Sequence, residues 1–409
     1  MTSKVPVNLV APKSKVDANS SGGVCAPNSA LSSSHLIAIC QNGTRYPATV
    51  TPARLSDLDF AADLVRDATG LAVSARLHLP RNAIVQKSDG SVVTAVDVAL
   101  QIYILDALDR KYGTVATIAE EDQESILGKP AAQAHVEFLL DQWGVDATPA
   151  RRAWALSCGR RDGSTRDLAR LWVLDPIDGT QGFVDGAHWC PCLALLAHGE
   201  VVFSANGHPT LARSRFEGGV ALAAERGSGT FARSLQHEAP AQRMQISSEP
   251  FASSEVVRVV SPDPATANQN AMRRAVGESV SARVELIPAA SQAKYGLIIM
   301  NEADVAYSRR GAGPGKYLWD HAGAILLARE AGAWVGDTDG SDIDLSQGRR
   351  LSANRAVICA ARGLGPRIAA ALAAGDVSEG FTQERGTTER TASTSSAHTS
   401  SRPPSATSL

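Results

Sequence analysis

Carboxylate side chains occur in four short clusters, each beside the end of a predicted helix or strand. The clusters are Lys87-Ser88-Asp89-Gly90, Ala119-Glu120-Glu121-Asp122, Asp175-Pro176-Ile177-Asp178-Gly179-Thr180 and Trp319-Asp320-His321-Ala322. Hard oxygen ligands of this kind suit Mg²⁺. Two such ions close together can neutralise a transferring phosphoryl group and activate a water molecule. The clusters therefore favour metal-assisted hydrolysis of a phosphate ester.

The central cluster combines residues that suit a ligand-binding turn. Pro176 fixes φ and has no N–H to donate, so Asp175 and Asp178 can face one point together with the Ile177 carbonyl. Gly179 lets the backbone approach a ligand closely, and a helix starting after it would offer free N–H groups to a phosphate. Alone, Asp-Pro-x-Asp-Gly would be a surface turn. The metal-site hypothesis depends on all four clusters together.

Several segments along the chain occur in the same order as in a known family of enzymes. The matching segments are KSDGSVVTAVD (Lys87–Asp97), AEED, LDPIDGTQGF, ALAAERGSGTF (Ala221–Phe231), SQAKYGLIIMNEADVAY (Ser291–Tyr307) and WDHAGAILLAREAGAWVGD (Trp319–Asp337). In these residues the sequence resembles the lithium-sensitive, magnesium-dependent phosphatase superfamily that includes inositol monophosphatase. Its SQAKY block is most similar to the 3′(2′),5′-bisphosphate nucleotidases. The resemblance runs from about residue 55 to 365.

The resemblance implies two or three Mg²⁺ ions in one site. Glu120, Asp175 and the Ile177 carbonyl would bind one ion. Asp175, Asp178 and Asp320 would bind a second.

The resemblance also implies residues for water activation and substrate binding. Asp89 would contribute to a third metal position and, with Thr180, activate the attacking water. Backbone N–H groups of Gly179 and Thr180 would hold the phosphate. The rest of the nucleotide would contact Ser291, Lys294 and Arg309.

The implied reaction is hydrolysis of the 3′-phosphate of adenosine 3′,5′-bisphosphate to AMP and phosphate. Phosphoadenosine phosphosulfate would be a second substrate, which links the activity to sulfate assimilation. Three departures from the family pattern lie near the leaving group: Gln181, Asp185 and the segment 260–263. Two alternatives are therefore open, an inositol phosphate phosphatase and a catalytically weak nucleotide-binding sensor.

The elements that would position these residues alternate along the chain. Helices are expected over 57–77 and 319–331. A third helix is expected from a Thr94–Asp97 capping box to Gly113, and a fourth follows the last strand and ends at about residue 374. Strands are expected at 117–119, 171–174, 193–197, 201–205 and 355–360. The expected fold is a layered α/β sandwich (αβαβα) like that of inositol monophosphatase. Its two subdomains would cover 55–235, with most metal ligands, and 236–375.

The ends of the chain differ in composition from the middle. Residues 1–50 are rich in serine and poor in acids, which is typical of a chloroplast or mitochondrial transit peptide or of a disordered extension. A cleaved transit peptide would place the protein in an organelle, and an uncleaved extension would place it in the cytoplasm. The segment 376–409 is rich in threonine and serine and is predicted to be disordered.

Charge and cysteine content narrow the class of partner. The formal net charge is −2, which does not favour nucleic acid, and the apolar runs are too short to span a bilayer. A small-molecule nucleotide bisphosphate is the expected partner, and no protein partner is implied. The cysteines are predicted to be small buried side chains. They are Cys25, Cys40, Cys158, Cys190, Cys192 and Cys359.

Overall fold

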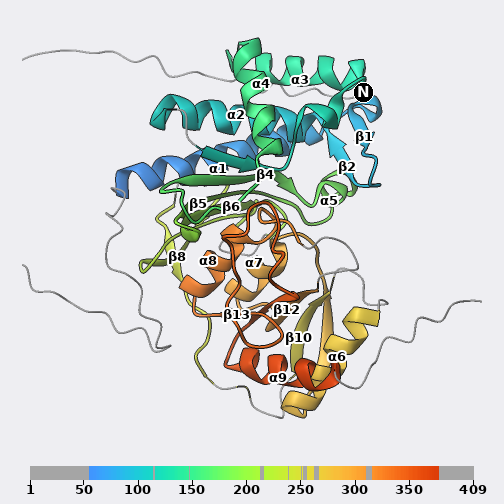
Figure 1. Ribbon diagram of the computed structural model, residues 1–409, viewed down its shortest axis with the longest axis vertical. Helices are drawn as coiled ribbons and strands as arrows, with labels where there is room; N and C mark the ends of the chain where they lie inside the picture. Colours follow the sequence, from blue (N-terminus) through green and yellow to red (C-terminus); the bar gives the residue numbers. More distant parts are fainter. Residues whose placement is uncertain are drawn as a thin grey trace, which may run out of the picture. The chain divides into compact units, whose positions relative to one another are not determined.

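The computed structural model describes residues 55–113, 116–146, 148–211, 216–237, 239–249, 251, 256–261, 267–309 and 316–376. Three parts of the chain named above lie outside these residues. They are the predicted N-terminal extension or transit peptide, residues 262–263 of the segment 260–263, and the predicted tail beyond 376. In the described part, layers of helices and sheets follow one another from the top to the bottom of Figure 1. The predicted α/β class and its αβαβα layering are confirmed.

The larger sheet has seven strands in the order β3-β4-β5-β6-β7-β8-β9. Only the β3–β4 pair is parallel among the described strands of this sheet, and the others form an antiparallel meander. The strands are β3 (Ala116–Ala119), β4 (Leu171–Asp178), β5 (Cys190–Ala197), β6 (Glu200–His208), β7 (Val220–Glu225), β8 (Gly229–Ser234) and β9 (Gln242–Met244).

Helices cover both faces of this sheet because side chains alternate along its strands. Trp172 and Leu174 pack into the core under the first helices, whereas Leu171 and Val173 pack into the core on the opposite face. The helices on the first face are α1 (Leu55–Arg76) and α2 (Ala95–Tyr112), with α3 (Pro130–Gln142) and α4 (Pro149–Ser157) packed on α2. A small hairpin of β1 (Ile84–Gln86) and β2 (Val92–Thr94) precedes α2.

The smaller sheet has five strands in the order β11-β10-β12-β14-β13. Its strands are β10 (Val256–Ser261), β11 (Arg283–Pro288), β12 (Val305–Arg309), β13 (Trp334–Gly336) and β14 (Ala356–Ala360). Between the two sheets lie α7 (Ala293–Ile299) and α8 (Ala322–Glu330). The outer face is covered by α6 (Ala267–Val280) and α9 (Leu364–Asp376). A short helix α5 (Thr180–Asp185) follows β4.

Most predicted elements are confirmed, with one correction. The capping box forms as expected: Thr94 caps α2, Asp97 bonds back to the Thr94 N–H, and the helix ends at Gly113. The predicted start of a helix at Trp319 is wrong, because α8 begins at Ala322. The three residues before it form a turn in which the His321 N–H donates to Leu318 O at 3.2 Å.

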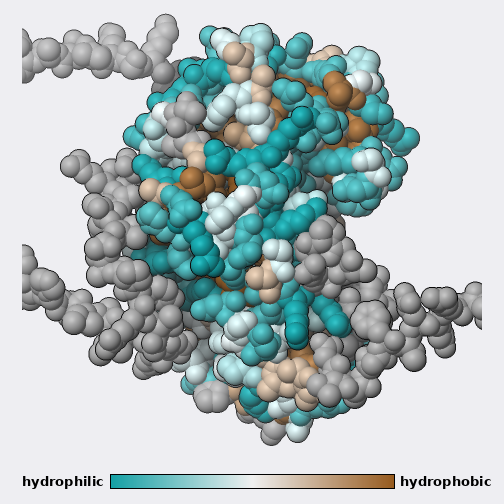
Figure 2. Space-filling view, viewed as in Figure 1, coloured by the Kyte–Doolittle hydropathy of each residue, from teal (hydrophilic) through white to brown (hydrophobic). Residues whose placement is uncertain are grey.

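The predicted subdomain boundary near residue 236 stays a prediction, although β9 extends the first sheet beyond it. The face of the molecule seen in Figure 2 is mostly hydrophilic, with small apolar patches toward its upper end. Isolated exposed side chains such as Leu77 and Phe138 are ordinary on a protein surface. Of the helices in the described ranges, none combines the length and apolar character that a bilayer crossing requires.

Candidate active site

A β-bulge at the end of β4 brings the two central aspartates together. Asp175 pairs with Cys192 and Asp178 pairs with Cys190. Between these two pairs β4 has one more residue than β5. Pro191 lies opposite this bulge, where a strand tolerates the loss of a backbone donor. Strict alternation would place residues 175 and 178 on opposite faces, and the bulge re-aims one of them.

Asp320 joins these two residues from the other half of the fold. It lies in the turn before α8, and its carboxylate oxygen is within 4.8 Å of an oxygen of both Asp175 and Asp178. Asp175 is 1% exposed, whereas Asp178 and Asp320 are partly exposed. We call these three residues the acidic triad. They bring carboxylate oxygens to one point, which is the donor set that a hard divalent cation needs.

Glu120 extends the triad from the adjacent strand. β3 runs parallel to β4, and the Glu120 N–H donates to Leu174 O at 3.1 Å, just past the end of β3. Its carboxyl group hydrogen-bonds Asp175. Oε2 of Glu120 and Oε2 of Glu121 are buried and have no hydrogen-bond partner in the described part of the chain. Lys87 Nζ lies 2.7 Å from Glu121 Oε1 and 3.8 Å from Glu120 Oε1.

The electrostatics of these carboxyls show that their charge is not balanced. Burial and then Glu121 raise the pKa of Glu120 to about 8. Burial and then Glu120 and Asp178 raise the pKa of Asp175 well above its ordinary value. Burial also raises the pKa of Asp320 to about 6, although Lys294 acts against it. With unpartnered oxygens at the same place, this acidic site fits a divalent cation bound through oxygen.

Thr180 lies at the first turn of α5 and is 8% exposed. Its hydroxyl lies 2.9 Å from Asp97 Oδ1 and 3.2 Å from Ile177 O. The other carboxylate oxygen, Asp97 Oδ2, accepts from the Thr94 hydroxyl at 2.6 Å. Burial and then Glu121 raise the pKa of Asp97 to about 7. Thr180 is therefore a hydroxyl whose proton is directed to a buried carboxyl group.

Asp89, the residue expected to act with Thr180, forms its hydrogen bonds within its own turn. It is in the exposed turn between β1 and β2, where its Oδ1 accepts from the Ser91 N–H at 3.0 Å and the Ser91 hydroxyl at 2.6 Å. These bonds, the Ser91 hydroxyl first, lower the pKa of Asp89. In the described residues the Thr180 hydroxyl is paired with Asp97 instead. A role of Asp89 in catalysis stays a prediction.

Gln292 connects the acidic triad to the surrounding elements. Its backbone N–H donates to Asp178 Oδ2, and the left-handed φ of 56° at Ser291 precedes it. Its buried amide accepts from Asn206 Nδ2 at 3.1 Å and donates to Trp319 O at 2.9 Å. Gln292 thus fixes the turn before α8, which carries Asp320, relative to β4.

The predicted phosphate-binding backbone, that of Gly179 and Thr180, lies beside the acidic triad. Gly179 has φ 90°, and a Cβ there would lie 2.9 Å from both His188 O and the Ser291 Cβ. Only glycine fits this position without displacing the neighbouring chain. Gly179 is the residue before the first turn of α5, so the N–H groups of that turn begin beside the triad.

Basic side chains border the triad on the side of the second sheet. Lys294 Nζ donates to Ser291 O at 2.9 Å. Burial and then the neighbouring Lys294 lower the pKa of Lys316. Both lysines act to lower the pKa of Asp320. Arg309 is at the end of β12, and its predicted nucleotide contact stays a prediction.

Two of the departures from the family pattern interact with each other. Gln181 Nε2 donates to Asp185 Oδ2 at 2.7 Å along one exposed side of α5. The pair consists of a neutral donor and an acid that satisfy each other.

Three residues beside the site were given no role by sequence reasoning: Asp97, Gln292 and Lys316. The sequence pattern predicts only a helix cap at Asp97, yet Asp97 is a buried acid between Val96 and Val98, which is itself unusual. Gln292 and Lys316 carry no such local signal, because their contacts come from distant segments.

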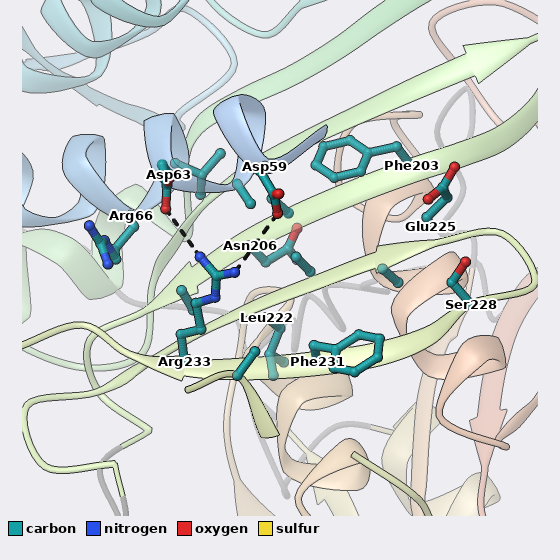
Figure 3. A pocket seen from close by; sticks show the side chains of 17 residues that line it. Asp59, Asp63, Arg66, Phe203, Asn206, Leu222, Glu225, Ser228, Phe231 and Arg233 are labelled. Carbon is teal, nitrogen blue, oxygen red and sulfur yellow. Dashed lines mark hydrogen bonds and ion pairs between the residues drawn. The ribbon is translucent and has the colours of Figure 1, made fainter. Parts of the chain in front are cut away.

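A separate cavity of about 290 Å³ lies between α1 and the strands β6, β7 and β8. Figure 3 shows the guanidinium of Arg233 among the lining side chains, directed at Asp63 and Asp59. Arg233 approaches Asp63 at 3.4 Å and Asp59 at 3.8 Å. Of the described residues lining this cavity, none belongs to the acidic triad, so the candidate site is defined by the triad and its neighbours.

Comparison with known proteins agrees with this geometry. A family model described as the inositol monophosphatase family matches residues 55–378. A probable 3′(2′),5′-bisphosphate nucleotidase of Arabidopsis thaliana is 27% identical over 77% of this chain and 94% of its own length. The 3′(2′),5′-bisphosphate nucleotidase of Emericella nidulans is 28% identical over 70% of this chain and 89% of its own.

Solved structures share the fold at lower identity. The IMPase of Thermotoga maritima has a TM-score of 0.52 at 18% identity, covering 79% of this chain and 99% of that one. The extragenic suppressor protein suhB of Bartonella henselae also has a TM-score of 0.52 at 18% identity, covering 78% and 98%.

Proposed function

Because this chain belongs to the inositol monophosphatase family, we propose that it is a Mg²⁺-dependent phosphomonoesterase acting on the 3′-phosphate of a nucleoside 3′,5′-bisphosphate. The observation that carries the proposal is the convergence of Asp175, Asp178 and Asp320 from segments more than 140 residues apart, with oxygens within 4.8 Å of one another. The products would be AMP and inorganic phosphate when the substrate is adenosine 3′,5′-bisphosphate.

The residues that would hold Mg²⁺ are the acidic triad, Glu120 and the Ile177 carbonyl. When bound, Mg²⁺ would neutralise negative charge on the transferring phosphoryl group and lower the pKa of a bound water. The oxygen-only donor set and the raised pKa values of Glu120 and Asp320 support this assignment.

Thr180 and Asp97 would orient and deprotonate the attacking water. A hydroxyl that donates to Asp97 has its lone pairs free to accept a hydrogen bond from water. Proton transfer from the water through Thr180 would end on Asp97, as the new oxygen–phosphorus bond forms and the bond to the leaving oxygen breaks. The leaving 3′-oxygen would take a proton from solvent and become the hydroxyl of AMP. This is general base catalysis by a carboxyl group whose pKa of about 7 suits neutral pH.

The substrate class follows from the relatives and from the charge beside the triad. Both relatives described above are nucleotidases for 3′(2′),5′-bisphosphates. Burial and then Lys294 lower the pKa of Lys316, so the ammonium group of Lys294 lies close enough to repel that of Lys316. A second phosphate on the substrate would relieve that repulsion. A monophosphate such as inositol 1-phosphate leaves it in place.

Phosphate release from three esters at fixed Mg²⁺ tests the proposal. We expect adenosine 3′,5′-bisphosphate to be hydrolysed with a higher kcat/KM than inositol 1-phosphate or AMP. Lys294→Ala should raise KM for the bisphosphate about 10-fold or more and affect inositol 1-phosphate much less. Preferential turnover of inositol 1-phosphate would favour the inositol phosphatase alternative. Tight nucleotide binding without turnover would favour the sensor.

A further inference from the structure

Cys190 and Cys192 bring two thiols to one point on β5, the strand that pairs with the active-site end of β4. Residues i and i+2 of a strand point to the same face, so the single intervening residue Pro191 is compatible with paired sulfurs. The two Sγ atoms lie 3.4 Å apart, and both side chains are buried. Both cysteines are free thiols.

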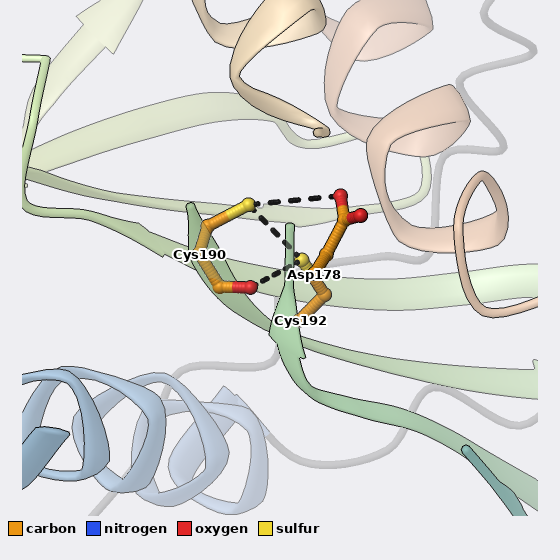
Figure 4. A group of neighbouring side chains, drawn as sticks. All are labelled: Asp178, Cys190 and Cys192. Atoms are coloured by element: carbon orange, nitrogen blue, oxygen red, sulfur yellow. Dashed lines mark hydrogen bonds between the residues drawn. The ribbon is translucent and has the colours of Figure 1, made fainter. Parts of the chain in front are cut away.

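The same two thiols face a member of the acidic triad. Cys190 Sγ lies 4.0 Å from Asp178 Oδ2, and one ligand atom from each of Asp178, Cys190 and Cys192 lies within 4.8 Å of the others. Figure 4 shows the three side chains pointing toward one another from β4 and β5. Asp178 is therefore shared by two potential ligand sets, one with oxygen donors only and one with sulfur.

We propose that Asp178, Cys190 and Cys192 form a second metal site, selective for a thiophilic divalent cation such as Zn²⁺ or Cd²⁺. Tetrahedral zinc with bonds of about 2.3 Å to sulfur and about 2.1 Å to oxygen separates two thiolates by about 3.8 Å, and a thiolate from a carboxylate oxygen by about 3.6 Å. The observed separations of 3.4 and 4.0 Å differ from these by a few tenths of an ångström.

His208 lies next to the thiol of Cys190. This imidazole is 1% exposed, hydrogen-bonds the Cys190 thiol, and has a buried Nδ1 with no partner in the described part of the chain. A buried imidazole next to a metal-binding thiolate orients it and tunes its affinity. Soft sulfur donors select zinc or cadmium over Mg²⁺. Binding would release the proton of each coordinating thiol to solvent.

The consequence for activity rests on the proposed function. A thiophilic cation that recruits Asp178 removes one ligand from the oxygen-only set, so it would inhibit at stoichiometric concentration even when Mg²⁺ is in excess. The inhibition would come from competition for one shared carboxylate and would need both thiols.

Titration of the reduced, full-length protein with Cd²⁺ in excess Mg²⁺ tests the site without relying on activity. We expect a thiolate-to-Cd²⁺ charge-transfer band that saturates at one equivalent. Cys190→Ser/Cys192→Ser should lose it, with binding weakened by more than about 100-fold, because two direct ligands matter more than an outer-shell partner. Cys158→Ser/Cys359→Ser is the matched control and should keep the band. The single variant Cys190→Ala gives the same answer if the double variant fails to fold.

Three results would overturn the proposal. The band would be absent from the wild-type protein, or retained in the variant lacking Cys190 and Cys192, or present with no loss of phosphate release. The first two reject the site, and the third rejects the sharing of Asp178. A protein with the Cd²⁺ band but no phosphatase activity under any condition would instead reject the proposed function and leave the site standing.

Discussion

The hydroxyl of Thr180 lies 2.9 Å from Oδ1 of Asp97, a residue 83 positions earlier that also forms the cap of α2. The carboxyl group of Asp97 thus links the start of α2 to the start of α5, which follows β4. Its Oδ2 is occupied by Thr94, so only Oδ1 is available to Thr180. This arrangement fixes the direction of the Thr180 hydroxyl without using Asp89.

The first prediction concerns this pair. Thr180→Ala and Asp97→Asn should each reduce kcat by about 10² to 10⁴-fold, the usual contribution of a positioned base. Thr180→Ser keeps the hydroxyl and should retain most of the activity. Steady-state phosphate release checks these values, with Asp89→Asn measured alongside. A larger loss for Asp89→Asn than for Asp97→Asn would return water activation to Asp89.

The second prediction concerns the charge of the triad. Asp178→Asn removes one of three closely spaced like charges, so the metal-free protein should melt at a higher temperature than wild type. The same change should abolish most of the Mg²⁺-dependent rise in melting temperature. Asp141→Asn, in the exposed part of α3, is the control and should alter neither value. Thermal unfolding with and without Mg²⁺ measures both, and an unchanged Mg²⁺ response in Asp178→Asn would remove Asp178 from the metal site.

The third prediction concerns pH. The pKa values of Asp320, Asp97 and Glu120 are raised to about 6, 7 and 8. Between their ordinary values near 4 and these raised values, the folded protein holds protons that the unfolded chain has released. Stability of the metal-free protein should therefore fall as pH rises from about 4.5 to 8. Carboxyls with lowered pKa, such as Asp344, act below this window.

Mg²⁺ binds the ionised carboxylates, so its effect should run in the opposite direction. The rise in melting temperature caused by saturating Mg²⁺ should be larger at pH 8 than at pH 5. Glu120→Gln should flatten the metal-free pH profile at its upper end. Metal-free stability that increases between pH 5 and pH 8 would contradict the assignment of these carboxyls as an uncompensated group.

Sequence reasoning succeeded where an interaction lies between near neighbours. The Thr94–Asp97 capping box spans three residues, and the hairpin of β5 and β6 turns within a few, so local patterns predict both. The start of α8 was misplaced because Trp319 and Asp320 fit the apolar and acidic pattern of a first turn. The turn there is instead stabilised by contacts with the distant Gln292.

The site was predictable in its residue types but not in its pairings. The carboxylate clusters are visible in the sequence, and the structure brings Glu120, Asp175, Asp178 and Asp320 together. Their convergence depends on the bulge at the end of β4, which lies opposite Pro191. Pro191 comes 15 positions after Pro176, and this spacing does not predict how β4 and β5 pair. Pairings across long separations are set by packing of whole elements, which no local pattern encodes.

The last prediction concerns Gln292, which is fully buried between the two sheets. Its amide joins Asn206 on β6 and Ala324 N on α8, each at 3.1 Å, and it donates to Trp319 O. Gln292→Ala would leave these buried groups unpaired, at about 1–3 kcal/mol for each. We expect the free energy of unfolding to fall by about 3 kcal/mol or more, measured by urea denaturation. Gln133→Ala, on the exposed side of α3, should change it by less than about 0.5 kcal/mol.

Gln292 should also affect the metal site, which a purely structural residue far from it would not. Its backbone N–H holds Asp178, and its side chain holds the turn that carries Asp320. Loss of the amide should therefore weaken Mg²⁺ binding about 10-fold or more, as loss of outer-shell partners does elsewhere. Calorimetric titration of the folded variant with Mg²⁺ measures this at low temperature, where the destabilised protein is still native. An unchanged Mg²⁺ affinity in Gln292→Ala would show that the triad is positioned by the backbone of β4 and the turn before α8 alone.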